Sequence, residues 1–451
     1  MCAFSRAWRT AVQPYRIMRF LSFLTVIRPR PVVITGWLAG LIAVGMLAGC
    51  GGGGGSSSSS NSATSAAATS TIAAADTNVS TITVQQGPNA NLANAPFVTV
   101  TVCAPGSSTC DTINNVIVDT GSVGLRVLAS AVPNSLSTLT RIQLSSSSQY
   151  LAVCGQFLSG YTWGTGRLAD IKMSGQSASS VPIQVIADSA VGSAPSQCSN
   201  GSATSYSTAA TLGANGILGV EGLIQDCGAT CVSTATSAWY WGCSSTTACS
   251  SPSQTTVPLA QQITNPVSKF ATDNNGVIIE LPVIASTGAA TATGALVFGI
   301  GTRTNNALGS ATVVQTDSAF NFKSTYNGTT NTGAFVDTGS NFLYLDDSSI
   351  ATCTSGSYSG FFCPSSTVSR SVTFSSNVSG ATSTYSTTFN IANAQTLFSG
   401  NNYYAYNDIG VQQTNQMDFG LPFFYGKNVF VKMETAANLR DGYLAFISNV
   451  N

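Results

Sequence analysis

Residues 118–127 read VDTGSVGLRV and residues 336–345 read VDTGSNFLYL, and the two stretches align without a gap. Each is an apolar run followed by an acid, a glycine turn and a second apolar run, a pattern that predicts strand, turn, strand. Downstream of each copy an apolar segment ends in glycine, at residues 217–219 and at residues 418–420. The repeat therefore predicts two halves of similar layout, each centred on an aspartate.

Short strand patterns surround both copies. Residues 97–102 alternate apolar and polar side chains, and residues 115–118 form the predicted partner strand that leads directly into Asp119. The 43 glycines and the weak helix signals, of which residues 258–269 are the best, favour strands and turns. We predict an all-β fold with two pseudo-symmetric lobes, residues 79–262 and residues 263–451.

The two aspartates suggest acid–base chemistry. A strand that ends in Asp-Thr-Gly-Ser presents a carboxylate on a turn that glycine makes possible, and the turn amides and the hydroxyl can hydrogen-bond that carboxylate. If two such turns face each other, Asp119 and Asp337 cannot both ionise easily, so one of them keeps a proton. The ionised acid could then activate a water molecule, and the protonated acid could polarise a carbonyl group.

The doubled Asp-Thr-Gly-Ser motif resembles the pepsin-like, bilobed aspartic peptidases, in an uncharacterised bacterial lipoprotein branch. Residues 214–219 (ANGILG), 296–299 (LVFG), 419–431 (FGLPFFYGKNVFV) and 442–446 (GYLAF) are similar to further segments of that family. The resemblance implies an active-site cleft between two lobes and hydrolysis of peptide bonds by an activated water. It implies no cofactor and no metal.

Carried over by motif, the resemblance implies a role for each residue of the two turns. Asp119 and Asp337 would be the catalytic pair, on turns shaped by Gly121 and Gly339. Thr120 and Thr338 would lock the two turns together, while Ser122 and Ser340 would hydrogen-bond the outer carboxylate oxygens.

Residues 161–166 (YTWGTG) resemble the flap hairpin of the same family. Trp163 stands directly before Gly164, where the family usually has tyrosine. Either Tyr161 supplies the phenol from a shifted register or the site lacks it.

The chain contains no histidine, which excludes a Ser-His-Asp triad, a Cys-His pair and a His-ligated zinc site. Ten of its twelve cysteines lie beyond the leader, an even number that favours disulfides in an oxidising compartment. The first pairings we expect are Cys103–Cys110, Cys243–Cys249 and Cys353–Cys363. A metal site formed by Cys227, Cys231, Cys243 and Cys249 is the alternative.

Residues 32–49 form an apolar run behind an Arg-rich segment, which predicts a signal peptide or a membrane span. Residues 47–50 (LAGC) resemble a bacterial lipobox, which implies that residues 1–49 are removed and that Cys50 carries the lipid. Residues 50–78 would then be a Gly/Ser tether to the membrane. The resemblance implies a cell-envelope protein, on the outer membrane if the cell has one, facing the periplasm or the exterior. An uncleaved N-terminal helix is the alternative, and Met18 is a possible start.

Without the six arginines of residues 1–49, the chain has 11 basic and 17 acidic side chains, which argues against nucleic acid as a partner. We expect a membrane-anchored monomeric endopeptidase acting on an extended polypeptide. The alternatives are an inactive binding or adhesion module and a protein that only processes itself.

Residues 239–241 (WYW) either line the cleft or pack inside a disulfide-bonded excursion of the chain. Asp346 and Asp347 are predicted to be solvated turn acids.

Overall fold

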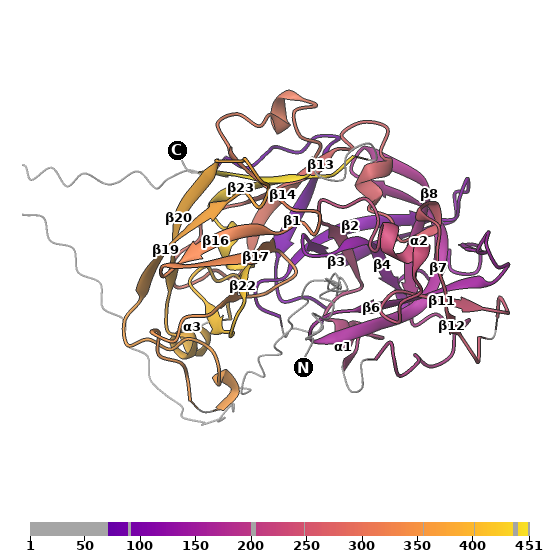
Figure 1. Ribbon diagram of the computed structural model, residues 1–451, viewed down its shortest axis with the longest axis horizontal. Helices are drawn as coiled ribbons and strands as arrows, with labels where there is room; N and C mark the ends of the chain where they lie inside the picture. Colours follow the sequence, from indigo (N-terminus) through magenta and orange to yellow (C-terminus); the bar gives the residue numbers. More distant parts are fainter. Residues whose placement is uncertain are drawn as a thin grey trace, which may run out of the picture.

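The computed structural model describes residues 71–88, 92–199, 204–247, 249–354, 356–400, 402–435 and 441–449. Within these ranges strands dominate, and the α-helices α1 (Ala209–Leu212), α2 (Ala229–Ser233) and α3 (Ala394–Gly400) are short. The all-β prediction is confirmed. Figure 1 shows the strands of the first half, from indigo to magenta, on one side, and those of the second half, from orange to yellow, on the other. Cys50, the lipobox and most of the predicted tether lie outside the described residues.

In the first half, six strands pair around a closed ring, in the order β2, β3, β10, β4, β8 and β7, with β7 pairing back to β2. Their alternating apolar side chains point into one buried core. The bounds are β2 (Pro96–Cys103), β3 (Cys110–Asp119), β10 (Gly216–Val220), β4 (Val123–Leu128), β8 (Gln176–Ile186) and β7 (Gly160–Met173).

Shorter strands extend this ring at β7. β6 pairs with β7 and with β11, β11 pairs with β12, and β5 and β9 pair with β7. Their bounds are β5 (Thr140–Arg141), β6 (Tyr150–Gln156), β9 (Thr204–Ser205), β11 (Tyr240–Cys243) and β12 (Ser253–Gln254).

In the second half, seven strands form one sheet in the order β20, β19, β16, β17, β22, β18, β21. Phe322, Phe374 and Phe419 pack their rings together against this sheet. The bounds are β16 (Phe322–Tyr326), β17 (Thr329–Asp337), β18 (Leu343–Leu345), β19 (Val368–Ser375), β20 (Thr384–Ile391), β21 (Gly410–Gln412) and β22 (Met417–Gly420).

The repeat in the sequence is a repeat in strand pairing. In the first half, β3 is parallel to β10, β10 is antiparallel to β4, and β4 is parallel to β8. In the second half, β17 is parallel to β22, β22 is antiparallel to β18, and β18 is parallel to β21. Asp119 stands opposite Gly219 in one half, and Asp337 stands opposite Gly420 in the other. The two aspartates therefore occupy equivalent places in equivalent strands.

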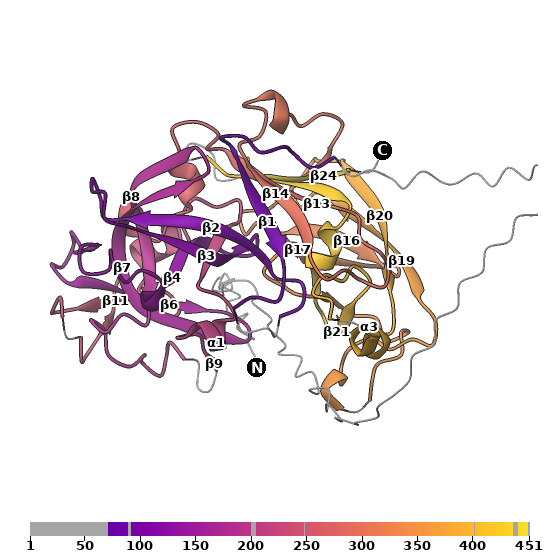
Figure 2. The ribbon, with the colours of Figure 1, turned by 180° about the vertical axis from the view of Figure 1, so that it is seen from behind.

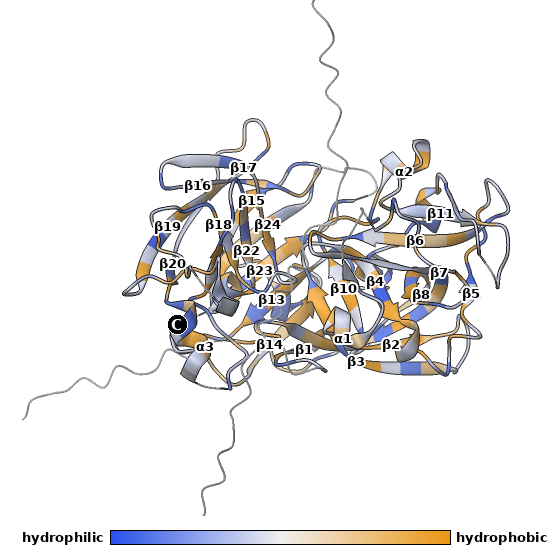
Figure 3. Ribbon diagram, turned by 90° about the horizontal axis from the view of Figure 1, so that it is seen from below, coloured by the Kyte–Doolittle hydropathy of each residue, from blue (hydrophilic) through white to orange (hydrophobic). Residues whose placement is uncertain are grey.

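A third group of strands connects the halves. β1, β14, β13, β23, β24 and β15 pair antiparallel in that order, and β1 also pairs with β2. Figure 2 shows β1 lying beside β14, although the two are far apart in the sequence. Figure 3 shows hydrophobic residues on the strands at the centre of the molecule. The bounds are β1 (Val79–Val84), β13 (Gly276–Leu281), β14 (Ala292–Phe298), β15 (Thr312–Gln315), β23 (Lys427–Lys432) and β24 (Tyr443–Ser448).

The cysteines of the described residues form disulfides. Cys103–Cys110, Cys243–Cys249 and Cys353–Cys363 are paired as predicted, and Cys154–Cys198 and Cys227–Cys231 complete the set. The alternative zinc site is wrong, because all four of its cysteines are bonded in pairs. Cys103–Cys110 closes the β2–β3 hairpin that leads into Asp119, and the predicted hairpin is confirmed.

Two local predictions are wrong. Residues 258–269 form two 3₁₀ turns, η2 (Leu259–Gln261) and η3 (Pro266–Lys269), because Pro266 cannot continue a helix from the preceding turn. Asp347 is not solvated. It is buried, which raises the pKa of its carboxyl, but hydrogen bonds from Ser349, Tyr326 and Arg370 together bring that pKa far below the usual range.

The remaining 3₁₀ turns are η1 (Ala129–Ala131), η4 (Thr304–Asn306), η5 (Gly356–Tyr358) and η6 (Leu421–Phe424). In the parts of the chain that the structure describes, no helix is long and apolar enough to cross a membrane.

Candidate active site

The two Asp-Thr-Gly-Ser turns lie directly against each other. Asp119 ends β3 and Asp337 ends β17, and both side chains are fully buried. A Cβ atom added to Gly121 would lie 2.7 Å from the carboxyl carbon of Asp337, and one added to Gly339 would lie 2.7 Å from Oδ1 of Asp119. Each glycine is therefore required because the opposite carboxyl group occupies the space of its missing side chain.

Thr120 and Thr338 lock the two turns together through four hydrogen bonds. The backbone N–H of each threonine donates to the hydroxyl of the other, at 3.0 Å in both directions. The hydroxyl of Thr120 donates to the carbonyl of Val336, and the hydroxyl of Thr338 donates to the carbonyl of Val118. This reciprocal lock fixes the distance and orientation between the two acids.

The lock gives a stability prediction. Thr120→Val would leave the buried N–H of Thr338 and the buried carbonyl of Val336 without partners, which we expect to lower the free energy of unfolding by about 1–3 kcal/mol. Urea denaturation measures this loss. Thr120→Ser keeps the hydroxyl and is the matched control. Equal stability of Thr120→Val and Thr120→Ser would contradict the lock.

Each carboxylate is also held by its own turn. The N–H of Gly121 donates to Oδ1 of Asp119 at 2.8 Å, and the N–H of Gly339 donates to Oδ1 of Asp337 at 2.7 Å. These equivalent bonds keep both carboxyl groups in the same orientation relative to their strands.

The serines of the two turns differ in their partners. The hydroxyl of Ser122 donates to Oδ2 of Asp119. The hydroxyl of Ser340 lies 2.8 Å from Oδ2 of Asp337 and also 2.6 Å from Oδ2 of Asp418 on β22. A third buried acid therefore stands beside the pair, on the side of Asp337 only.

The electrostatic surroundings separate the two acids. Burial raises the pKa of both carboxyls. The pKa of Asp337 is raised further, well above its ordinary value, by the charges of Asp119 and Asp418. Hydrogen bonds from Ser122 and Asp337 and the charge of Arg126 counteract the rise at Asp119. The pair therefore titrates as one coupled unit, in which the charges of Asp119 and Asp418 favour the protonated form of Asp337.

The sequence did not predict the surroundings of Arg126, although the residue lies within the first motif. Its guanidinium is fully buried and donates to Asp226 at 2.9 Å and to Gln184 at 2.7 Å. Tyr240 donates its hydroxyl to the other oxygen of Asp226, and Thr162 donates to Gln184. A charged residue in an otherwise apolar strand was the available signal, because a buried arginine requires an acid partner.

The predicted flap is a hairpin of β6 and β7 with its turn at residues 157–159. Tyr161 stands opposite Gln156 and Trp163 opposite Cys154. Gly164 fits closely against β8, because an added Cβ would lie 1.9 Å from the carbonyl oxygen of Val185. Residues 161–166 thus lie on one strand of the hairpin, β7, and the turn of the hairpin precedes them.

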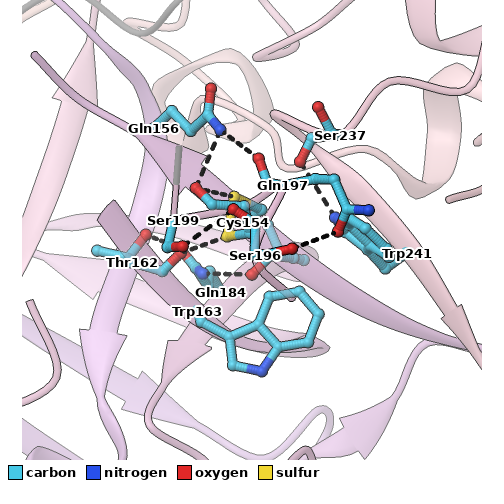
Figure 4. The surroundings of a disulfide bond; sticks show 12 residues. Cys154, Gln156, Thr162, Trp163, Gln184, Ser196, Gln197, Ser199, Ser237 and Trp241 are labelled. Carbon is cyan, nitrogen blue, oxygen red and sulfur yellow. Dashed lines mark hydrogen bonds between the residues drawn. A yellow bond between two sulfur atoms is a disulfide. The ribbon is translucent and has the colours of Figure 1, made fainter. Parts of the chain in front are cut away.

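Trp163 belongs to a cluster beside the Cys154–Cys198 disulfide, shown in Figure 4. Its indole N–H donates to the carbonyl of Gly192 at 2.8 Å, and its ring meets Trp241 edge to face at 6.2 Å. Gln156 on β6 donates to the carbonyl of Cys198, so the loop beyond the disulfide is tied to the same hairpin. The side chain of Trp163 therefore packs within this buried cluster.

Tyr161 lies near the end of the hairpin and is half-buried. Its carbonyl accepts the N–H of Tyr206, and β9 pairs with β7 at this point. Residues 239–241 pack in the interior: Trp239, Tyr240 and Trp241 are all buried. Within the ranges that the structure describes, no group of three or more Cys, Asp or Glu side chains is arranged to hold a metal ion.

The fold and the site define an all-β protein in which two repeated turns join a buried pair of acids. The chain belongs to the family described as "Protein of unknown function (DUF3443)", whose model matches residues 74–446. That range includes both Asp-Thr-Gly-Ser motifs, Arg126 and Asp418. No curated protein matches the chain.

Proposed function

We propose that this protein is a pepsin-like aspartic endopeptidase in which Asp119 and Asp337 activate a water molecule. The observation that carries the proposal is the reciprocal lock of Thr120 and Thr338, which brings two equivalent buried acids together. A buried pair of acids is costly unless the pair shares a proton, and a pair that shares one proton contains both a base and an acid.

The chemistry follows from the difference between the two acids. Asp119 as the ionised partner takes a proton from the water as it attacks the carbonyl carbon of the peptide bond. Asp337 donates its proton to the carbonyl oxygen, on which negative charge develops. The tetrahedral species then collapses: Asp119 gives the proton it took from the water to the nitrogen, the C–N bond breaks, and Asp337 takes a proton back from a hydroxyl group of the tetrahedral carbon, which restores the starting pair. Each step moves protons between groups that are already in place and needs no covalent intermediate.

The substrate in this proposal is an extended polypeptide lying between two pepsin-like lobes. The repeated strand pairing supports the two-lobe arrangement, because β3, β4, β8 and β10 correspond to β17, β18, β21 and β22. The proposed anchor is a lipid on Cys50, at the cell envelope and facing the periplasm or the exterior, with the protein acting as a monomer. The lipobox-like residues 47–50 are the support for that anchor.

The test is cleavage of an unfolded protein by residues 71–451. This start keeps the N–H of Ala73, which donates to Glu280 on β13 at 2.6 Å and ties the N-terminal segment to the connecting strands. We expect fragments with new N-termini at some pH between about 3 and 8, the range in which buried carboxyl pairs change protonation. No cleavage at any pH in that range would contradict the proposal.

A second candidate function is an inactive binding or adhesion module with the same fold. The packing of Trp163 against Trp241 favours it, because the family's usual tyrosine is replaced by a side chain held within a buried cluster. Binding of the unfolded protein without cleavage would support this second function.

A further inference from the structure

The hydroxyl of Ser340 lies between two acids. Its Oγ is 2.8 Å from Oδ2 of Asp337 and 2.6 Å from Oδ2 of Asp418, and all three side chains are fully buried. A serine hydroxyl carries one proton, and ionised carboxylates only accept hydrogen bonds. Ser340 therefore donates to one acid, and the other acid must carry a proton and donate it to Oγ.

A second contact in the same group also requires a proton. Oδ1 of Asp119 and Oδ1 of Asp337 lie 2.7 Å and 3.0 Å from the same point, the place of a Cβ atom on Gly339, so the two carboxyl groups face each other closely and keep one proton between them. The group of Asp119, Asp337 and Asp418 thus needs two protons in addition to the hydroxyl protons. Three ionised carboxylates in a fully buried site would also be costly.

The equivalent position in the first half of the molecule has no acid. Ile217 on β10 occupies the place of Asp418 on β22, two residues before the glycine that stands opposite the aspartate. Ser122 consequently has Asp119 as its acid partner, without an acid from β10. The third carboxyl is thus specific to the second half and is not part of the repeat.

We propose that Asp418 is a positioning residue that acts through Ser340, and that the three carboxyl groups hold two protons up to about neutral pH. The assignment deepens the proposed function, and its kinetic part rests on that function. Asp418 in its protonated form donates to Ser340, which turns the hydroxyl proton of Ser340 toward Asp337. The carboxyl group of Asp337 is then held with its own proton directed at Asp119.

The pH dependence follows from the groups around Asp418. β17 contributes Asp337, β18 contributes Tyr344 opposite Asp418, and η6 contributes no titratable side chain. Once Asp418 is ionised, the remaining proton is shared between Asp119 and Asp337. The new negative charge on Asp418 then adds to burial and to the charge of Asp119 in raising the pKa of Asp337. A raised pKa keeps the acid protonated to higher pH, so Asp418 extends activity on the alkaline side.

The proton count is tested without any substrate. The full chain, purified in a detergent that lacks carbonyl groups, is compared with Asp418→Asn by infrared spectroscopy near neutral pH. We expect the variant to lose the carbonyl absorbance of one protonated carboxylic acid. Asp418→Ile, which copies the first half, is the second variant if Asn disturbs folding. An unchanged absorbance in this region would overturn the two-proton assignment.

The kinetic arm compares the pH profiles of kcat/KM. We expect Asp418→Asn to move the alkaline limb to lower pH by about one unit, the usual effect of removing a like charge nearby, and to leave the acid limb in place. Asp408→Asn is the matched control, since Asp408 is also buried with a raised pKa but lies on another segment. An alkaline limb that stays in place would overturn the role of Asp418. If the wild-type chain cleaves nothing, the peptidase proposal fails, while the infrared result still decides the proton count.

Discussion

Asp119→Asn and Asp337→Asn are each expected to reduce the rate of peptide cleavage at least about 1000-fold, because each removes one of the two proton-transfer groups. Asparagine has the shape of a protonated aspartate, so the turns keep their geometry. The double variant is expected to be about as inactive as either single variant, since the two acids act as one unit. Cleavage of a defined peptide by purified variants measures both effects.

Asp346→Asn is the matched control for these variants. Asp346 follows β18 in the same half, and its side chain is exposed to solvent. We expect full activity from Asp346→Asn. A similar loss in all three variants would mean that the assay reports folding, and full activity in Asp119→Asn would exclude the proposed mechanism.

Gly121→Ala and Gly339→Ala are expected to give the second largest effect. Each new methyl group would lie 2.7 Å from an atom of the opposite carboxyl group, closer than real Cβ contacts allow. One acid must therefore move, and a displacement of about 1 Å in a catalytic group lowers the rate about 100-fold. The strain is also expected to reduce the free energy of unfolding by about 1–3 kcal/mol.

Gly333→Ala provides the control for the glycine variants. Gly333 lies on the same strand as Asp337, and an added Cβ would meet only a side-chain oxygen of Asn331, at 3.6 Å. Urea denaturation and the cleavage rate should both remain close to wild type. Wild-type activity in Gly121→Ala would show that the turns do not meet as described.

The centre of the site was predictable because the repeat is local and explicit. The acids, threonines, glycines and serines of both turns occupy continuous motifs, and Gly219 and Gly420 stand opposite Asp119 and Asp337. Disulfides between near neighbours, such as Cys103–Cys110, were predictable for the same reason: a short loop leaves few alternative partners.

The partners of Arg126, Asp418 and Asp347 could not be predicted, because they lie on segments that are distant in the sequence. Arg126 is paired with Asp226, which lies 100 residues away, and nothing in either local sequence identifies the partner. Asp418 was noted only as part of the repeated segment at residues 418–420. Ser340, which it contacts, lies 78 residues earlier in the sequence. Asp347 was misassigned because burial by Tyr326 and Arg370 is a property of the folded sheet.

The flap illustrates a different limit. The sequence predicted a hairpin at residues 161–166, which in the structure lie on one of its two strands, and it did not predict the role of Trp163. That role follows from Trp241 and from the Cys154–Cys198 disulfide, which closes a loop of 44 residues. The local motif therefore does not determine where Trp163 packs, because its packing partners lie far away in the sequence.

The shape of the pH profile of wild-type kcat/KM tests the central claim most directly. A pair with Asp119 ionised and Asp337 protonated is active only between the two pKa values of the pair, which predicts a bell-shaped profile. Because burial raises the pKa of both acids, both limbs should lie above the ordinary aspartate value of about 4. A rate that rises steadily to alkaline pH, or that shows no dependence on protonation, would contradict a catalytic pair that shares a proton.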